Sequence, residues 1–144
     1  MTSVERTFTV TAPAADVLEY LSDFANTEQW DPATQRTVRL NDGPVAPGAT
    51  WRNTSKVFGR TSDLTYTMRS RTSDTLVFVG ENKTLTTIDT IAVRPSGTGT
   101  EITYHVDLDL HGAAKLAAPV MKLEFEKLAH DTQKKLIEVL NRLD

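Results

Sequence analysis

The feature that most constrains this chain is a long middle section of short runs in which polar and apolar side chains alternate. Turn residues such as Asn41-Asp42-Gly43-Pro44 and Pro95-Ser96-Gly97 separate these runs. Alternation with a period of two is typical of a β-strand with one buried face. The connections are too short for parallel crossovers, so the strands are expected to pair antiparallel as a meander. The predicted strands are residues 35–40, 49–58, 63–71, 75–82, 85–94 and 100–110.

The segment before this section predicts one more strand and two short helices. Residues 3–11 alternate, and one of their faces holds Val4, Arg6, Phe8 and Val10. Thr11 is expected to cap a helix that begins near Pro13, since threonine suits an N-cap and proline suits a first turn. A second helical piece over residues 26–30 should end at Trp30, because Asp31 precedes a proline and such residues avoid the α conformation.

The final segment, from Gly112 onward, changes to a period of about 3.6 residues and predicts one long amphipathic helix. Pro119 should begin this helix or kink it. The apolar stripe consists of Met121, Phe125, Leu128, Thr132, Leu136 and Leu140. Three more residues are expected to widen the stripe at its start, namely Leu116, Val120 and Leu123.

Length and composition restrict the class of protein. A chain of 144 residues with 39% hydrophobic and 24% charged residues is expected to fold as one domain over residues 1–144. Its net charge of −3 argues against nucleic acid as a partner. The absence of cysteine excludes disulfides and thiolate chemistry. Because no segment resembles a signal peptide or a membrane span, we expect a cytoplasmic protein without membrane insertion.

These elements together predict an α+β fold in which a seven-stranded antiparallel sheet curves around the long C-terminal helix. One helix of about 10 Å diameter is narrower than such a sheet, whose strands lie about 4.8 Å apart. The helix therefore cannot fill the concave face. A cavity between sheet and helix is the expected consequence.

Several motifs in this order resemble the SRPBCC superfamily, and within it the polyketide cyclase/dehydrase and lipid-transport group, relatives of START domains and the birch-pollen allergen. The matching stretches are Thr9-Val10-Thr11-Ala12-Pro13, Trp30-Asp31-Pro32, Pro47-Gly48-Ala49-Thr50-Trp51 and Gly97-Thr98-Gly99-Thr100-Glu101-Ile102-Thr103-Tyr104. The resemblance covers essentially the whole chain. It implies a helix-grip fold, with two short helices after the first strand, that binds hydrophobic small molecules.

Strand parity and the helical stripe predict which residues face the cavity, and Trp30 is added because it and Trp51 could gate the mouth. The candidate ligand-binding residues are Trp30, Trp51, Asn53, Tyr66, Met68, Phe78, Tyr104, Met121, Phe125 and Leu128. Most are apolar or aromatic, as in pockets for hydrophobic ligands, while Asn53, Tyr66 and Tyr104 could orient a polar group. The alternative is that these polar groups are ordinary core residues bonded to their neighbours, and that the two tryptophans only pack.

Catalytic and metal chemistry have little support in the sequence. The three histidines, His105, His111 and His130, have no partner that spacing identifies, and no His-x-His or His-Glu-x-x-His pattern occurs. We therefore expect no metal and no cofactor. Asp89 is the one weak candidate for a catalytic base, provided that its strand turns it inward, which periodicity leaves open.

The favoured function is binding or transport of a hydrophobic small molecule, such as a lipid, an isoprenoid or an aromatic polyketide. One alternative is an enzyme of the polyketide cyclase, aromatase or dehydratase kind. The other is a protein-interaction module, as in toxin-like or ubiquinone-associated relatives. We expect a binding protein rather than an enzyme, present as a monomer or a weak homodimer.

Overall fold

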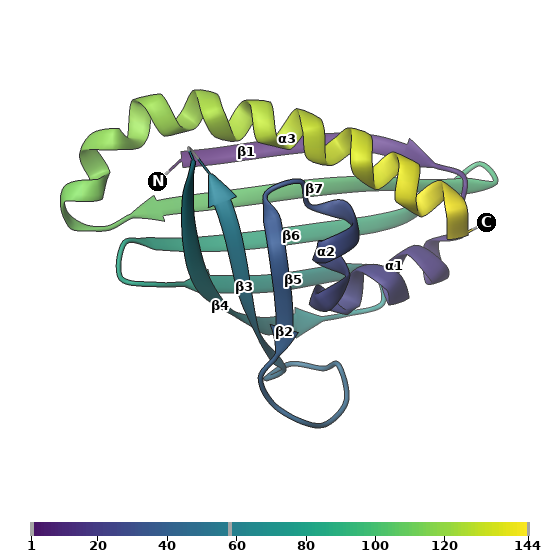
Figure 1. Cartoon of the computed structure of the whole chain (residues 1–144). Coiled ribbons are helices and arrows are strands. Elements are labelled where there is room, and N and C mark those ends of the chain that lie inside the picture. The colour runs from purple at the N-terminus through teal and green to yellow at the C-terminus, as the bar shows by residue number, and fades with distance from the viewer. Residues whose placement is uncertain (1, 58, 144) are drawn as a thin grey trace.

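The computed structural model describes residues 2–57 and 59–143. Over these residues the chain forms an antiparallel sheet of seven strands in the order β1-β7-β6-β5-β4-β3-β2 (Figure 1). The strands are β1 (Thr2–Val10), β2 (Thr34–Arg39), β3 (Thr50–Val57), β4 (Arg60–Arg71), β5 (Thr75–Glu81), β6 (Leu85–Ser96) and β7 (Gly99–Leu110). The predicted strands are confirmed, although Phe58, where one strand was expected to end, lies outside the described residues.

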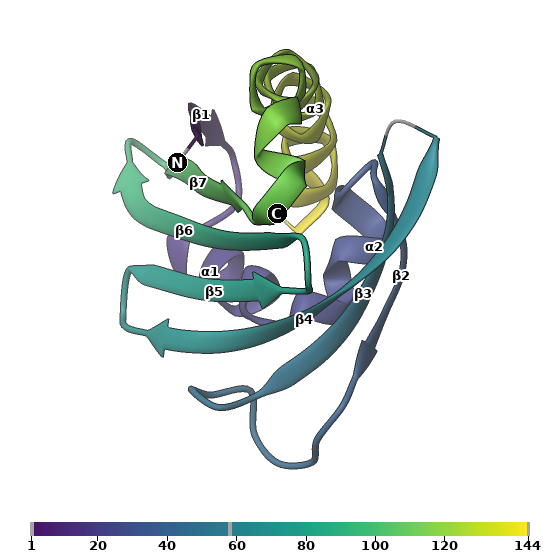
Figure 2. The same ribbon diagram turned by 90° about the vertical axis from the view of Figure 1, so that its left-hand side faces the viewer.

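The sheet curls around the last helix. Strands β2 to β7 pair in sequence order, and β1 closes the sheet on the far side of β7. Register shifts between Thr34 and Arg36 and between Met68 and Ser70 mark irregularities of the β-bulge kind, which bend strands. Figure 2 shows α3 (Ala118–Leu140) lying across the concave face. The expected helix-grip fold is therefore present.

The long helix begins as the sequence indicates. A 3₁₀ segment, η2 (Gly112–Ala117), precedes α3, and Pro119 lies in the first turn of α3, where a missing N–H costs nothing. The 3₁₀ turn η3 (Asn141–Leu143) follows the helix. Of the two expected roles of Pro119, helix start is the one observed.

Three short helical pieces connect β1 to β2: α1 (Ala14–Ser22), η1 (Phe24–Asn26) and α2 (Thr27–Trp30). The expected capping by Thr11 is wrong, because Pro13 occupies the N-cap and no side chain caps the described helix. Instead, the Thr11 amide and hydroxyl donate to Oδ1 of Asn141 at 2.9 Å and 3.2 Å. Thr11 thus ties the end of β1 to the end of α3.

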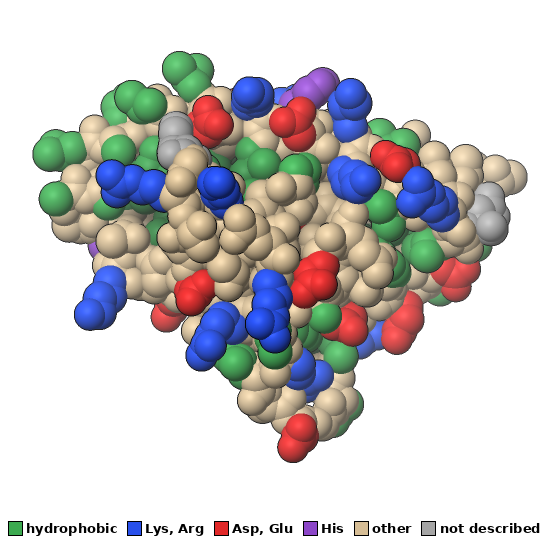
Figure 3. Space-filling view, viewed as in Figure 1, with side chains coloured by type: hydrophobic (Ala, Val, Ile, Leu, Met, Phe, Trp, Pro, Cys, Tyr) green, Lys and Arg blue, Asp and Glu red, His purple; other side chains and the backbone are tan. Residues whose placement is uncertain are grey.

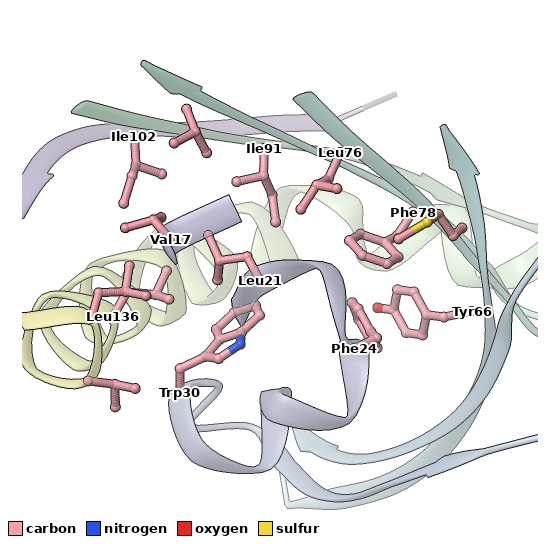
Figure 4. Packing of buried hydrophobic residues seen from close by; sticks show 14 of the residues in the cluster. Val17, Leu21, Phe24, Trp30, Tyr66, Leu76, Phe78, Ile91, Ile102 and Leu136 are labelled. Atoms are coloured by element: carbon pink, nitrogen blue, oxygen red, sulfur yellow. The ribbon is translucent and has the colours of Figure 1, made fainter. Parts of the chain in front are cut away.

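The hydrophobic core lies at one end of the concave face. Side chains from α1, from η1 and from the C-terminal half of α3 meet the sheet there (Figure 4). Phe24 stacks on Tyr66 with ring centroids 4.2 Å apart and lies 4.8 Å from the ring of Phe78. Leu136 and Leu140 close the cluster from the helix, and neither is exposed.

The start of the last helix does not follow the sequence-based expectation. Leu116, Val120 and Leu123 were expected to widen its buried stripe, yet they are 88%, 64% and 75% exposed. Figure 3 shows hydrophobic side chains gathered at the surface over this end of the molecule. The reasons differ: Val120 borders the open cavity, whereas Leu116 of η2 and Leu123 lie outside its wall and face away from the sheet.

Candidate functional site

A cavity of about 590 Å³ lies between the concave face of the sheet and α3, mainly under the N-terminal half of the helix. Residues of β1, β3, β4, β6 and β7 form one wall, α3 forms another, and the end of α2 closes a third side. The cavity was expected because one helix is narrower than this sheet, and its volume falls in the range of small-molecule sites.

Six of the ten candidate ligand-binding residues line this cavity: Trp30, Tyr66, Tyr104, Met121, Phe125 and Leu128. The three from α3 are spaced three or four positions apart, so they share one helix face. They are only half-buried, because the space in front of them is open. Their contact with a ligand stays a prediction.

The other four candidates, Trp51, Asn53, Met68 and Phe78, lie in the packed core rather than in the cavity wall. Parity placed them on the correct face of the sheet, since each is at most 2% exposed. Their positions along the strands decide whether they border the cavity or the packed core. Phe24 of η1 occupies the space in front of Trp51 and Phe78, with ring centroids 6.0 Å and 4.8 Å away.

Asn53 illustrates the alternative in which a buried polar group is bonded to its neighbours. Its amide nitrogen donates to the hydroxyls of Thr34 and Thr37, at 2.9 Å each, and its carbonyl oxygen accepts from Ser55 at 2.5 Å. Thr37 is bonded in turn to Thr27 at 2.6 Å. This network joins β3 to the edge strand β2 and to α2, and it stabilises that edge of the sheet.

Asp89 is the polar centre of the cavity wall. The structure settles its orientation: Asp89 of β6 points inward and is 6% exposed. Its Oδ2 accepts from the Tyr104 hydroxyl at 2.5 Å and its Oδ1 from the Thr87 hydroxyl at 3.0 Å. Burial raises the pKa of Asp89 to about 6, although both hydrogen bonds oppose the rise. The group can therefore gain or lose a proton near neutral pH.

A second carboxylate, Asp31, also lines the cavity. Its oxygens accept from the Ala33 amide at 3.0 Å and from the Thr34 hydroxyl at 2.8 Å, which fixes the side chain after α2. Burial raises the pKa of Asp31, and these bonds counteract that rise. The Asp31 charge also raises the pKa of Asp89, so the two carboxylates act on each other.

Arg6 of β1 adds a cation at the side of the cavity. It lies opposite Tyr104 in the register of β1 and β7. Its Nη2 donates to the Glu126 carbonyl of α3 at 3.3 Å, and the Glu126 carboxylate is 3.6 Å away. Arg6 therefore links the edge strand to the helix that covers the cavity.

Sequence reasoning missed Arg6, Asp31 and Thr87 as wall residues, although each left a signal. Arg6 is the lone charged residue on an otherwise apolar strand face. Thr87 shares the parity of Asp89, and Asp31 belongs to the Trp-Asp-Pro motif. Among residues 2–57 and 59–143, no three His, Asp or Glu side chains converge as a metal site. Nor does any described helix have both the length and the apolar character needed to cross a bilayer.

Comparison with known protein families identifies the family of this chain. The model of the polyketide cyclase/dehydrase and lipid-transport family matches residues 1–140. The chain belongs to this family. A comparison with curated protein sequences gave no significant match.

Solved structures of this SRPBCC-type fold are similar in shape but remote in sequence. A START superfamily protein from Mycobacterium smegmatis has 17% identity and a TM-score of 0.81, with all of both chains covered. The Zhui aromatase/cyclase from Streptomyces sp. R1128 has 16% identity and a TM-score of 0.81, over 97% of this chain and 93% of its own. TTHA0849 from Thermus thermophilus has 13% identity and a TM-score of 0.81, over 96% of each chain. At these identities the likeness establishes the fold alone.

Proposed function

We propose that this member of the family binds a hydrophobic small molecule in the cavity and that Asp89 and Tyr104 orient one polar group of that molecule. The observation that carries the proposal is an open volume of about 590 Å³ whose wall is mainly apolar and aromatic, with two hydrogen-bonded carboxylates, Asp89 and Asp31, facing it. Lipids, isoprenoids and aromatic polyketides all fit this description.

A comparison of free energies indicates that the apolar wall supplies most of the binding affinity. Burial of about 300 Å² of apolar ligand surface at about 25 cal/mol/Å² gives about 7 kcal/mol, whereas one neutral hydrogen bond contributes about 1 kcal/mol. Apolar burial is therefore expected to hold the ligand, and the polar groups to select its orientation.

A titration with Nile red, an uncharged apolar dye, tests the proposal. Phe125→Ala should weaken dye binding several-fold, because it removes an aromatic ring from the cavity wall. Leu123→Ala is the matched control, since Leu123 lies on the same helix and is 75% exposed. Equal affinities for the wild type and Phe125→Ala, with both proteins folded, would contradict binding in this cavity.

One observation favours the enzymatic alternative as a second candidate. Asp89 has a pKa of about 6 and bonds a tyrosine hydroxyl beside an apolar space, an arrangement suited to a general base. In a cyclase, Asp89 would take the proton from a carbon next to a ketone. The resulting enolate would attack a second carbonyl to form the C–C bond, and the proton would pass to the new alkoxide.

Turnover of a model poly-β-ketone separates the two functions. If the protein is a cyclase, Asp89→Asn should lower the rate of ring closure while substrate affinity stays within about twofold. If ring closure is equally fast with and without the protein, the cyclase alternative is excluded and the binding function remains. The interaction-module alternative, the cytoplasmic location and the monomer or weak homodimer stay predictions.

A further inference from the structure

The charged groups around the cavity are unevenly distributed. Four charged residues line it: Arg6, Asp31, Arg60 and Asp89. Arg60 is exposed at the start of β4, and Arg6 pairs with Glu126 of α3. Asp89 is buried and Asp31 half-buried, and neither forms an ion pair with another described residue. The two carboxylates of the inner wall therefore lack a paired cation among the described residues, although the two arginines equal them in number.

Three aromatic residues, Trp30, Tyr66 and Tyr104, share the cavity wall with these carboxylates. The rings of Trp30 and Tyr104 meet edge to face with centroids 5.8 Å apart, and the Tyr104 hydroxyl bonds Asp89. Trp30 is also the residue before Asp31. Tyr66 also lines the cavity. Burial is the main cause that raises the pKa of Tyr66, and the charges of Asp89 and Asp31 raise it further. A cation that bonds such a carboxylate and also contacts the face of a neighbouring ring is attracted by two independent electrostatic effects.

From this arrangement we propose that the ligand is an apolar molecule with one protonated amine, whose ammonium group contacts Asp89 beside the rings of Tyr104 and Trp30. This inference rests on the proposed binding function and specifies its ligand. An ammonium would compensate the buried carboxylate, which is costly to leave without a counter-charge. A carboxylate head group at the same position, such as that of a fatty acid, would instead be repelled by Asp89 and Asp31.

Competition among matched ligands tests the proposal. Nile red bound to the protein is displaced with decylamine, decanol or decanoate at about pH 7.5, so that only the head group differs. Decylamine should displace the dye at a concentration about tenfold below that of decanol, and decanoate should need the highest concentration. Decanoate displacing as well as decylamine would overturn the inference.

Variants locate the effect. Asp89→Asn should abolish the preference for decylamine over decanol. Asp109→Asn is the control, because Asp109 lies outside the cavity wall on the neighbouring strand. An amine preference that survives in Asp89→Asn overturns the inference. If decanol displaces the dye and decylamine displaces it no better, the amine proposal is wrong but the proposed binding function stands. If none of the three compounds displaces the dye, the proposed function is contradicted as well.

The wild-type protein provides a test that needs no variant. The preference for decylamine over decanol should fall as pH is lowered through about 6, since Asp89 then takes up a proton. Other titratable or charged groups line this region: Arg6 of β1, Asp31 after α2, Arg60 and Tyr66 of β4, and Tyr104 of β7. Glu126 of α3 lies beside them as the partner of Arg6. A preference that stays constant down to about pH 5 would contradict the role of Asp89.

Discussion

The two halves of α3 cover the same concave sheet face, yet the space beneath them differs. Under the C-terminal half, Leu136, Val139 and Leu140 are buried against a core that includes α1 and η1. Under the N-terminal half, Met121 and Phe125 are half-buried and face the cavity. Figure 1 shows α1 and α2 beside only the C-terminal half.

The comparison shows that the inserted helices, and not the sheet, decide where the protein is solid. The same inward-facing rows of sheet residues become core where η1 supplies Phe24 and become cavity wall where no helix is inserted. A helix end without core beneath it needs other contacts. Here Arg6 and the Ser3 carbonyl of β1 provide them, by bonding Glu126 and Lys122 of α3.

The largest expected effect contrasts two phenylalanines. Phe78→Ala should lower the free energy of unfolding by about 3–5 kcal/mol, since it leaves a void in a filled core. Phe125→Ala should lower it by less than about 1 kcal/mol, because the ring already borders open space. Urea unfolding of both variants checks this contrast. Equal losses would mean that the two ends are packed alike.

A pH titration should separate the polar groups of the two ends. The pKa of Asp89 is raised from its ordinary value of 3.8 to about 6, so its contribution to stability is fully present below about pH 4 and is lost as pH rises through about 6. The stability of the wild type relative to Asp89→Asn should therefore fall by about 3 kcal/mol over that interval.

Asn53→Ala is the matched control for this titration, because Asn53 lies in the packed end and carries no titratable group. Its free energy of unfolding relative to the wild type should be constant over the same interval. Chemical denaturation at several pH values measures both differences. A flat profile for Asp89→Asn would show that the Asp89 carboxyl titrates alike in the folded and unfolded chain.

Gly80 tests the boundary between the two regions. A Cβ at this position would lie 2.7 Å from the Tyr66 ring and 2.9 Å from a Thr87 methyl carbon. Gly80→Ala should therefore cost about 1–3 kcal/mol of stability by displacing a cavity-wall ring. In a Tyr66→Ala background the part of that cost due to the ring should disappear and the part due to Thr87 should remain, and a thermal-unfolding cycle measures the coupling. An unchanged cost would place the strain elsewhere.

The smallest expected effect is on the outer face of the sheet, away from both regions. Hydrogen bonds with Asp107 and Glu5, at 2.9 Å and 3.1 Å, raise the pKa of His105. Its contribution to stability is present below its ordinary pKa and is lost as pH rises through the raised one. His105→Gln should therefore destabilise slightly, more at low pH than at high pH and less in high salt. NMR titration of the imidazole checks the shift.

The amino-acid sequence alone determined the elements and the faces of this protein. Alternation defined each strand, turn residues separated them, and Pro119 marked the start of the last helix, because these signals are local. The alternation along each strand likewise predicted that Trp51, Tyr66, Phe78 and Tyr104 point inward.

Only the tertiary structure decided what each inward residue meets. It paired β1 with β7, turned Asp89 into the cavity, placed Arg6 and Asp31 in its wall, and left Leu116 and Leu123 exposed. Periodicity records which side of an element is buried but not which other element covers it. That choice depends on contacts distant in sequence, above all on where the short helices after β1 come to lie.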